Sequence, residues 1–187
     1  MIQIIEIAAV VFGLIQGILV MLNKKSNWIF YIVQMLFMIV FSWMNNLWGD
    51  VVLNCWFVIQ GVIGLIMWNK EADVPVTTYT NNERGKWCIW SLLLFGLLAI
   101  ILKNTNDPVP FMDAFTTTGA LVATYMMAKK KLETWVIWFV IDIAYIIQYF
   151  IIPNQALYLM GLNVIWTSMA VASYINWKRL MNKSLQS

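Results

Sequence analysis

Seven long apolar runs follow one another along this chain, and few polar residues interrupt them. A helix that crosses the hydrocarbon part of a bilayer needs about 20 mostly apolar residues. The sequence therefore predicts an all-α integral membrane protein with seven transmembrane helices. The predicted spans are 2–22, 27–45, 49–68, 87–103, 109–128, 134–152 and 156–177, and the polar stretch 69–86 is the sizeable loop.

The composition excludes several other classes of protein. Hydrophobic residues make up 61% of the chain and charged residues 11%, with a mean hydropathy of +0.74; a soluble domain has about 25% charged residues. The net charge of +3 is spread over short clusters between the apolar runs, which argues against a nucleic-acid partner. There is no histidine, the commonest metal ligand and general base, so we expect no metal site and no cofactor. Cys55 and Cys88 are expected to be small buried side chains and not a disulfide.

The basic residues predict the orientation of the chain in the membrane. Loops on the cytoplasmic side carry an excess of Lys and Arg. If the N-terminus lies outside and the C-terminus inside, every one of the 12 Lys and Arg residues except Lys103 falls in a cytoplasmic loop or in the C-terminal tail. The opposite orientation, or an even number of spans, would destroy this alternation.

A weak internal repeat relates the first three spans to the last three. The segment that opens the second span resembles the one that opens the sixth, and the third and seventh spans both end in tryptophan followed by basic residues. Two parallel copies of three helices need one linking helix, which predicts a 3+1+3 arrangement within one transporter domain, 1–187: repeat one about 2–68, linking helix about 87–103 and repeat two about 109–177. The equivalent pairs are Trp28 and Trp135, Glu6 and Asp113, each 107 positions apart, and Trp68 and Trp177, 109 apart.

One face of the sixth predicted span combines a carboxylate with aromatic rings. Trp135, Trp138, Asp142, Tyr145 and Tyr149 are spaced 3, 4, 3 and 4 residues apart, which places them on one side of a helix. A charge in mid-membrane costs at least ~2.5–3.5 kcal/mol. Aromatic rings attract cations and the carboxylate neutralises them, so this face is a candidate receptor for an organic cation. The alternative is a protonated or helix-bridging aspartate among aromatic rings that simply pack.

Other polar residues of the spans have two interpretations each. Asp113 and the following threonines, Thr117 among them, are either a charge that complements a helix N-terminus with hydroxyls bonded to the backbone, or an extracellular gate. Asn54, Gln60, Asn163 and Trp166 either bridge helices or contact the substrate. Gly61 and Gly64 indicate close helix packing. Trp68 and Trp177, beside basic residues, are expected to anchor their helices at the membrane interface.

At these residues the chain resembles the PnuC family of vitamin transporters. The resemblance rests on the 3+1+3 plan, on Asn27-Trp28, on Asp113 with its threonines, and on the Trp135-x-x-Trp138-x-x-x-Asp142 motif. It covers most of the chain, although 69–86 and the linking helix match in position only. One departure is Asp142, where an amide is common in the family. A carboxylate suits nicotinamide riboside and thiamine alike, since both have a positively charged ring.

The resemblance implies a fold like that of the SWEET sugar transporters, a homotrimer, and a bacterial inner-membrane location. It implies facilitated diffusion of nicotinamide riboside, trapped by a cytoplasmic kinase, with thiamine as the alternative substrate. Trp135 and Trp138 would sandwich the flat ring, and Asp142 would hold its polar edge or a sugar hydroxyl. An intramembrane enzyme and a non-transporting assembly subunit are the alternatives from other classes. We expect no enzyme, because histidine and clustered carboxylates are missing. A retinal protein is excluded because no lysine lies inside a span, Lys103 being the last residue of its span.

Overall fold

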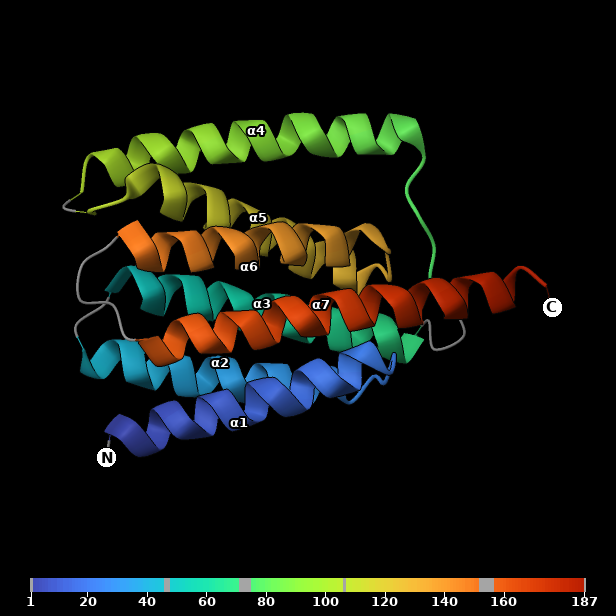
Figure 1. Ribbon diagram of the computed structural model, residues 1–187, viewed down its shortest axis with the longest axis horizontal. Coiled ribbons are helices and arrows are strands. Elements are labelled where there is room, and N and C mark those ends of the chain that lie inside the picture. The colour runs from blue at the N-terminus through green and yellow to red at the C-terminus, as the bar shows by residue number, and fades with distance from the viewer. Residues whose placement is uncertain (1, 46–47, 71–74, 106, 152–156, 187) are drawn as a thin grey trace. The chain divides into compact units, whose positions relative to one another are not determined.

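A computed structural model describes residues 2–45, 48–70, 75–105, 107–151 and 157–186. Seven α-helices lie in these residues (Figure 1). Four of them, α1 to α4, are long and apolar enough to cross a membrane. The helices are α1 Ile2–Met21, α2 Asn27–Met44, α3 Trp48–Lys70, α4 Asn81–Lys103, α5 Pro110–Ala128, α6 Glu133–Ile151 and α7 Leu157–Ser184.

The helices divide into two compact units, Met1–Val74 and Pro75–Ser187. In the first unit, α2 packs against both α1 and α3. In the second unit, α5 packs against α4 and α6, and α6 packs against α7. The first unit thus holds the first three predicted spans, and the second unit holds the other four.

The α1–α2 turn and the α5–α6 turn have the same backbone structure. Asn23 and Lys130 have positive φ angles, 54° and 51°, and their numbers differ by 107. A left-handed residue after a helix satisfies the last carbonyl groups of that helix. Four backbone hydrogen bonds form two equivalent pairs: Asn23 N to Val20 O (2.9 Å) with Lys130 N to Met127 O (3.0 Å), and Lys24 N to Leu19 O (2.9 Å) with Lys131 N to Met126 O (2.9 Å).

Each unit also contains one edge-to-face tryptophan pair. Trp28 and Trp68 have ring centroids 5.8 Å apart at 85°, and Trp135 and Trp177 have centroids 5.2 Å apart at 89°. Trp68 and Trp177 are 2% and 0% exposed, so the prediction that they anchor their helices at the interface is wrong. Their position beside basic residues suggested an anchor, but their indoles pack inward against another tryptophan of the same unit.

Gly64 explains how α2 and α3 come so close. A Cβ atom on Gly64 would lie 2.5 Å from Cε2 of Trp28, and one on Gly61 would lie 2.8 Å from Cγ1 of Ile32. Only a residue without a side chain fits at these contacts. The close packing predicted at Gly61 and Gly64 is confirmed.

The α4 helix begins earlier than predicted. Thr80 caps it: the Glu83 N–H donates to Thr80 Oγ1 (3.3 Å), and the Thr80 N–H donates to a carboxylate oxygen of Glu83 (2.8 Å). This reciprocal capping box makes residues 81–86 helical although they are polar. Hydropathy assigned these residues to the loop, which is therefore shorter than the predicted 69–86.

Two further predictions need correction. The α7 helix continues to Ser184, beyond the predicted end at 177, and Lys183 in its last turn is favourable at a helix C-terminus. Cys55 and Cys88 are free, as expected, but both are exposed on the surface of the chain and not buried. They lie among outward-facing apolar side chains such as Trp56 and Ile89, a surface that lipid can cover.

The segment before α4 is fastened to the α5–α6 turn within the second unit. The Thr77 N–H donates to Lys130 O (3.1 Å), and the Leu132 N–H donates to Thr77 O (2.9 Å). The Glu133 carboxylate accepts from the Tyr79 N–H (2.9 Å). These bonds hold 75–80 against the first turn of α6.

The same carboxylate also pairs with α4. Arg84 donates to Glu133 Oε1 through Nε (3.0 Å) and Nη2 (2.9 Å). Burial, together with the nearby Tyr125, Glu133 and Glu83, raises the pKa of Tyr79 to about 12. The phenol beside this cluster is therefore neutral at physiological pH, and Glu133 joins the start of α6 to both 75–80 and α4.

Candidate functional site

The predicted face of α6 is partly buried along its length. Trp135 and Asp142 are each 6% exposed, and Trp138 and Tyr145 are half-buried. The side chain of Tyr149 lies outside the described residues. The Trp135 ring is held edge-on by Trp177 of α7, which presets its orientation. Trp138, one turn further along, has more of its ring available to a ligand.

Asp142 is the charged group of this face. Among the described residues it forms no hydrogen bond and no ion pair, and α6 contains no Lys or Arg. A buried carboxylate is strongly unfavourable unless a partner compensates it. The arrangement is therefore suited to a ligand that brings a positive charge or hydrogen-bond donors to a surface walled by indole and phenol rings.

Close contact between α5 and α6 lies beside this face. A Cβ atom on Gly119 would lie 2.6 Å from Cδ1 of Ile141, the residue that precedes Asp142 and is 1% exposed. The Thr134 hydroxyl, fully buried in the first turn of α6, donates to the backbone oxygen of Ala123 in α5 (2.7 Å). These contacts fix the rotation of α6 about its axis.

Asp113 has a side-chain partner that the sequence did not suggest. Gln148 Nε2 of α6 donates to Asp113 Oδ1 of α5 at 2.7 Å. The Thr116 hydroxyl donates to the backbone oxygens of Met112 (3.1 Å) and Asp113 (3.3 Å), so its hydroxyl is bonded to the backbone of its own helix. Thr117 is half-buried, and its role as a gate stays a prediction.

The spacing of the sequence could have pointed to Gln148 as a further candidate site residue. It lies six residues after Asp142 and three after Tyr145, close to the predicted face. Its partner on α5 could not be inferred from α6 alone, because the pairing depends on how the two helices pack.

The remaining candidates lie on α3 and α7. In the second unit, Asn163 is 9% exposed, its backbone oxygen accepts from the Thr167 hydroxyl (2.8 Å), and Trp166 is half-buried. In the first unit, Asn54 is 8% exposed and its side-chain amide donates to Asp50 O of its own helix (2.7 Å), while Gln60 is half-buried. Contact of these residues with a substrate stays a prediction. The described residues contain no group of three acidic or Cys side chains that could hold a metal ion.

Known proteins of similar sequence and fold were found by comparison. The nicotinamide riboside transporter PnuC of Neisseria mucosa is 25% identical over 189 residues, which cover 94% of this chain and 72% of that protein. The proteins of the same name from Escherichia coli and Shigella flexneri are each 23% identical, over 86% of this chain and 79% of theirs. The crystal structure of the vitamin B3 transporter PnuC has the same fold, with a TM-score of 0.78 and 24% identity over 94% of this chain and 81% of that one.

A family model settles the relationship. The model described as nicotinamide mononucleotide transporter matches residues 3–179, nearly the whole chain. Together with the apolar helices, this places the protein in the bacterial inner membrane as a multi-pass protein. The chain belongs to the nicotinamide mononucleotide transporter family, to which its PnuC relatives also point.

Proposed function

We propose that this protein carries nicotinamide riboside across the membrane and binds it on the α6 face. The observation that carries the proposal is the buried Asp142, which has no protein partner among the described residues and shares a helix face with Trp138 and Tyr145. Nicotinamide riboside offers a flat, positively charged ring, which matches a carboxylate next to indoles. Relatives that match most of this chain are named as transporters of this compound.

Each side chain of the α6 face has its own proposed role in binding the substrate. Trp138, the more exposed tryptophan, covers one face of the ring, and Trp135, preset by Trp177, borders it. Asp142 balances the ring's charge or accepts from a sugar hydroxyl. Tyr145 continues the same face. Asn54, Gln60, Asn163 and Trp166 are proposed as further contacts with the substrate, and Asp113 and Thr117 as the gate.

Thiamine is the second candidate, because Asp142 favours any cationic ring where an amide would be indifferent to charge. Calorimetry on the purified protein separates the possibilities with nicotinamide riboside, thiamine and a neutral nucleoside as ligands. Asp142→Asn should weaken binding of the charged ligands and hardly change that of a neutral one. Trp138→Ala should weaken binding by ~1–2 kcal/mol, the scale of one desolvated ring–cation contact.

Matched controls are available in the first unit. Asp50→Asn and Trp56→Ala change an exposed aspartate and an exposed tryptophan of α3 and should leave binding unchanged. If Asp142→Asn binds nicotinamide riboside as tightly as the parent, Asp142 is no counter-ion. If the parent binds thiamine but not nicotinamide riboside, the substrate assignment is wrong.

The proposal includes a 3+1+3 arrangement of two parallel repeats. Equivalent hydrogen bonds in the α1–α2 and α5–α6 turns and one tryptophan pair in each unit support it. The 109-residue offset of Trp68 and Trp177 also relates Asn54 to Asn163, which are 8% and 9% exposed. It relates Gly64 to Ser173, a small residue that is 1% exposed.

The proposal also includes the orientation, with the N-terminus outside and the C-terminus inside. It is supported by the hydrogen bonds between 75–80 and the α5–α6 turn, because both segments are predicted to be cytoplasmic and therefore must lie at the same end of the second unit.

Transport is proposed to be facilitated diffusion by a homotrimer, with a cytoplasmic kinase that phosphorylates the substrate and so prevents its return. These features follow from the family resemblance. The absence of Lys and Arg from α6 is consistent with a site that lacks an ion-coupled charge pair. On this mechanism the protein is not itself an enzyme.

A further inference from the structure

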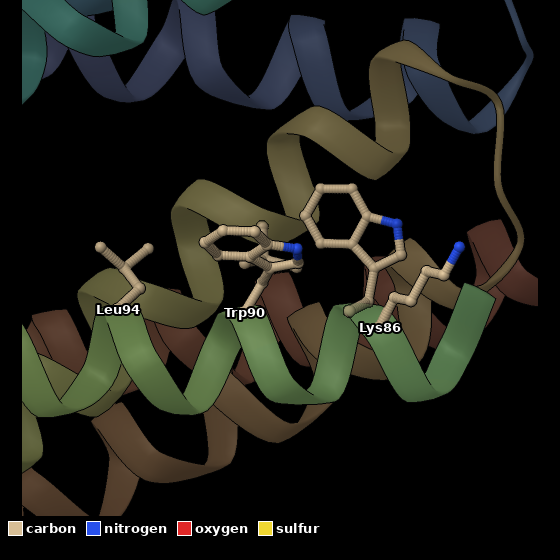
Figure 2. A pocket seen from close by; sticks show the side chains of 5 residues that line it. Lys86, Trp90 and Leu94 are labelled. Carbon is tan, nitrogen blue, oxygen red and sulfur yellow. The ribbon is translucent and has the colours of Figure 1, made fainter. Parts of the chain in front are cut away.

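A groove between α4 and α5 lies apart from the proposed substrate face. Its volume is about 510 Å³, and Figure 2 shows Lys86, Trp90 and Leu94 along its α4 side. These three residues are four positions apart and so form one stripe of the helix. Trp87 of α4 and Val122 of α5 complete the lining.

The wall of the groove is apolar and aromatic. Trp90 of the lining is 65% exposed, and Leu93 and Leu97, which lie outside the lining on the same helix, are 60% and 56% exposed. The Trp87 ring lies 5.1 Å from that of Tyr125 of α5. Such a surface is stable in contact with hydrocarbon and not with water.

One end of the groove is positively charged. Lys86 lines it from the second turn of α4. Lys129 follows α5 outside the lining, with its Nζ 6.0 Å from the centre of the Tyr125 ring, which itself lies 5.1 Å from the Trp87 ring of the lining. Both lysines are exposed, and neither has a salt-bridge partner among the described residues. Glu83 is the acidic residue nearest to Lys86 in sequence, and the capping box at Thr80 already uses its carboxylate.

Three other basic residues lie close to Lys86 or Lys129 in sequence and are buried or engaged, and of these Lys130 is 4% exposed. Arg84 pairs with Glu133, and Lys131 Nζ donates to the Thr77 hydroxyl (3.0 Å). Lys86 and Lys129 are thus the cations that a ligand of this groove can use.

We propose that this groove binds one anionic phospholipid. Lys86 and Lys129 hold the phosphate, the Trp87 and Tyr125 rings lie at the level of the glycerol, and an acyl chain runs along Trp90 toward the bilayer centre. Basic pockets beside apolar helix surfaces on the cytoplasmic side are suited to acidic headgroups. A second copy of this chain is a poorer match, because its net charge of +3 offers no excess of negative charge.

Native mass spectrometry of the full chain, released from detergent with added phosphatidylglycerol or phosphatidylcholine, tests the proposal. The parent protein should retain phosphatidylglycerol in preference to phosphatidylcholine. Each lysine near an anionic surface contributes about fivefold in affinity, so Lys86→Gln should lower the preference about fivefold and Lys86→Gln with Lys129→Gln about 25-fold. Lys103→Gln, at the other end of α4, should leave the preference unchanged.

Several results would overturn the proposal. One is equal retention of the two lipids by the parent. Another is a loss in Lys103→Gln as large as in the double variant, since the effect would then be one of net charge. Competition by millimolar inorganic phosphate would show a site for a soluble anion, and subunit cross-links through Trp90→Cys would show that a second copy covers the groove. Because all these variants lie outside the α6 face, the outcome is independent of the proposed transport function.

Discussion

Gly64→Ala tests the packing that brings α2 and α3 together. The new Cβ would lie 2.5 Å from Cε2 and 2.6 Å from Cδ2 and Cζ2 of Trp28, about 1 Å inside ordinary contact distance. Trp28 has no free space to move into, because it is 0% exposed and packs edge-on against Trp68. Either the ring leaves its position or the helices separate.

The expected loss can be estimated from two opposing effects. Forcing an extra carbon into a packed core costs about 1–3 kcal/mol. Alanine is better than glycine in a helix by roughly 0.5–1 kcal/mol. The net destabilisation should therefore be up to about 2.5 kcal/mol, a fall in melting temperature of up to roughly 10 °C for a chain of this size.

Thermal unfolding in detergent, followed by intrinsic tryptophan fluorescence, gives the measurement. Gly96→Ala is the matched control, because a Cβ there meets no atom within 4 Å and should leave the melting temperature unchanged or slightly higher. Trp28→Leu should make Gly64→Ala nearly harmless in the double variant. If Gly64→Ala is as stable as Gly96→Ala, the close contact does not limit this pair of helices.

Three more predictions concern topology, transport and the fastening at α6. In a cysteine-free background, Asn45→Cys should react with an impermeant reagent in intact cells and Lys25→Cys should not; the reverse pattern would refute the orientation. Sealed liposomes without kinase should equilibrate nicotinamide riboside but never concentrate it, and accumulation under a proton or sodium gradient would contradict facilitated diffusion. Glu133→Gln and Arg84→Gln should each lower thermal stability by up to about 1 kcal/mol, a small value because the Arg84 side chain is 51% exposed. Their double variant should lose no more than either, and additive losses would show that the two residues act separately.

The seven helices could be predicted because hydropathy reports directly on long apolar runs, and four of them, α1 to α4, are apolar enough to cross a membrane. The start of α4 could not, since the Thr80–Glu83 capping box stabilises polar helical turns that hydropathy scores as loop. Hydropathy combined with the capping-box pattern would have placed the start of α4 at Asn81.

The contacts that individual side chains make with other helices could not be predicted from the sequence either. Trp68 and Trp177 have the sequence context of interfacial anchors, yet each is buried against a tryptophan more than 35 residues away in the chain. The face of α6 followed from its periodicity alone, whereas the Asp113–Gln148 bond depends on the packing of two helices and has no local signal.

The similar turns bear on which parts of the proposed repeat are free to diverge. By the 107-residue offset, Met35 of α2 corresponds to Asp142 of α6, and the two are 8% and 6% exposed. The positions that close the turns and hold the indoles in place keep similar structures in both units. The position proposed to bind the charge of the substrate does not: it is a neutral thioether in one unit and a carboxylate in the other. On the proposed repeat, the turns and the tryptophan pairs are what the two units share, and a single buried side chain sets them apart.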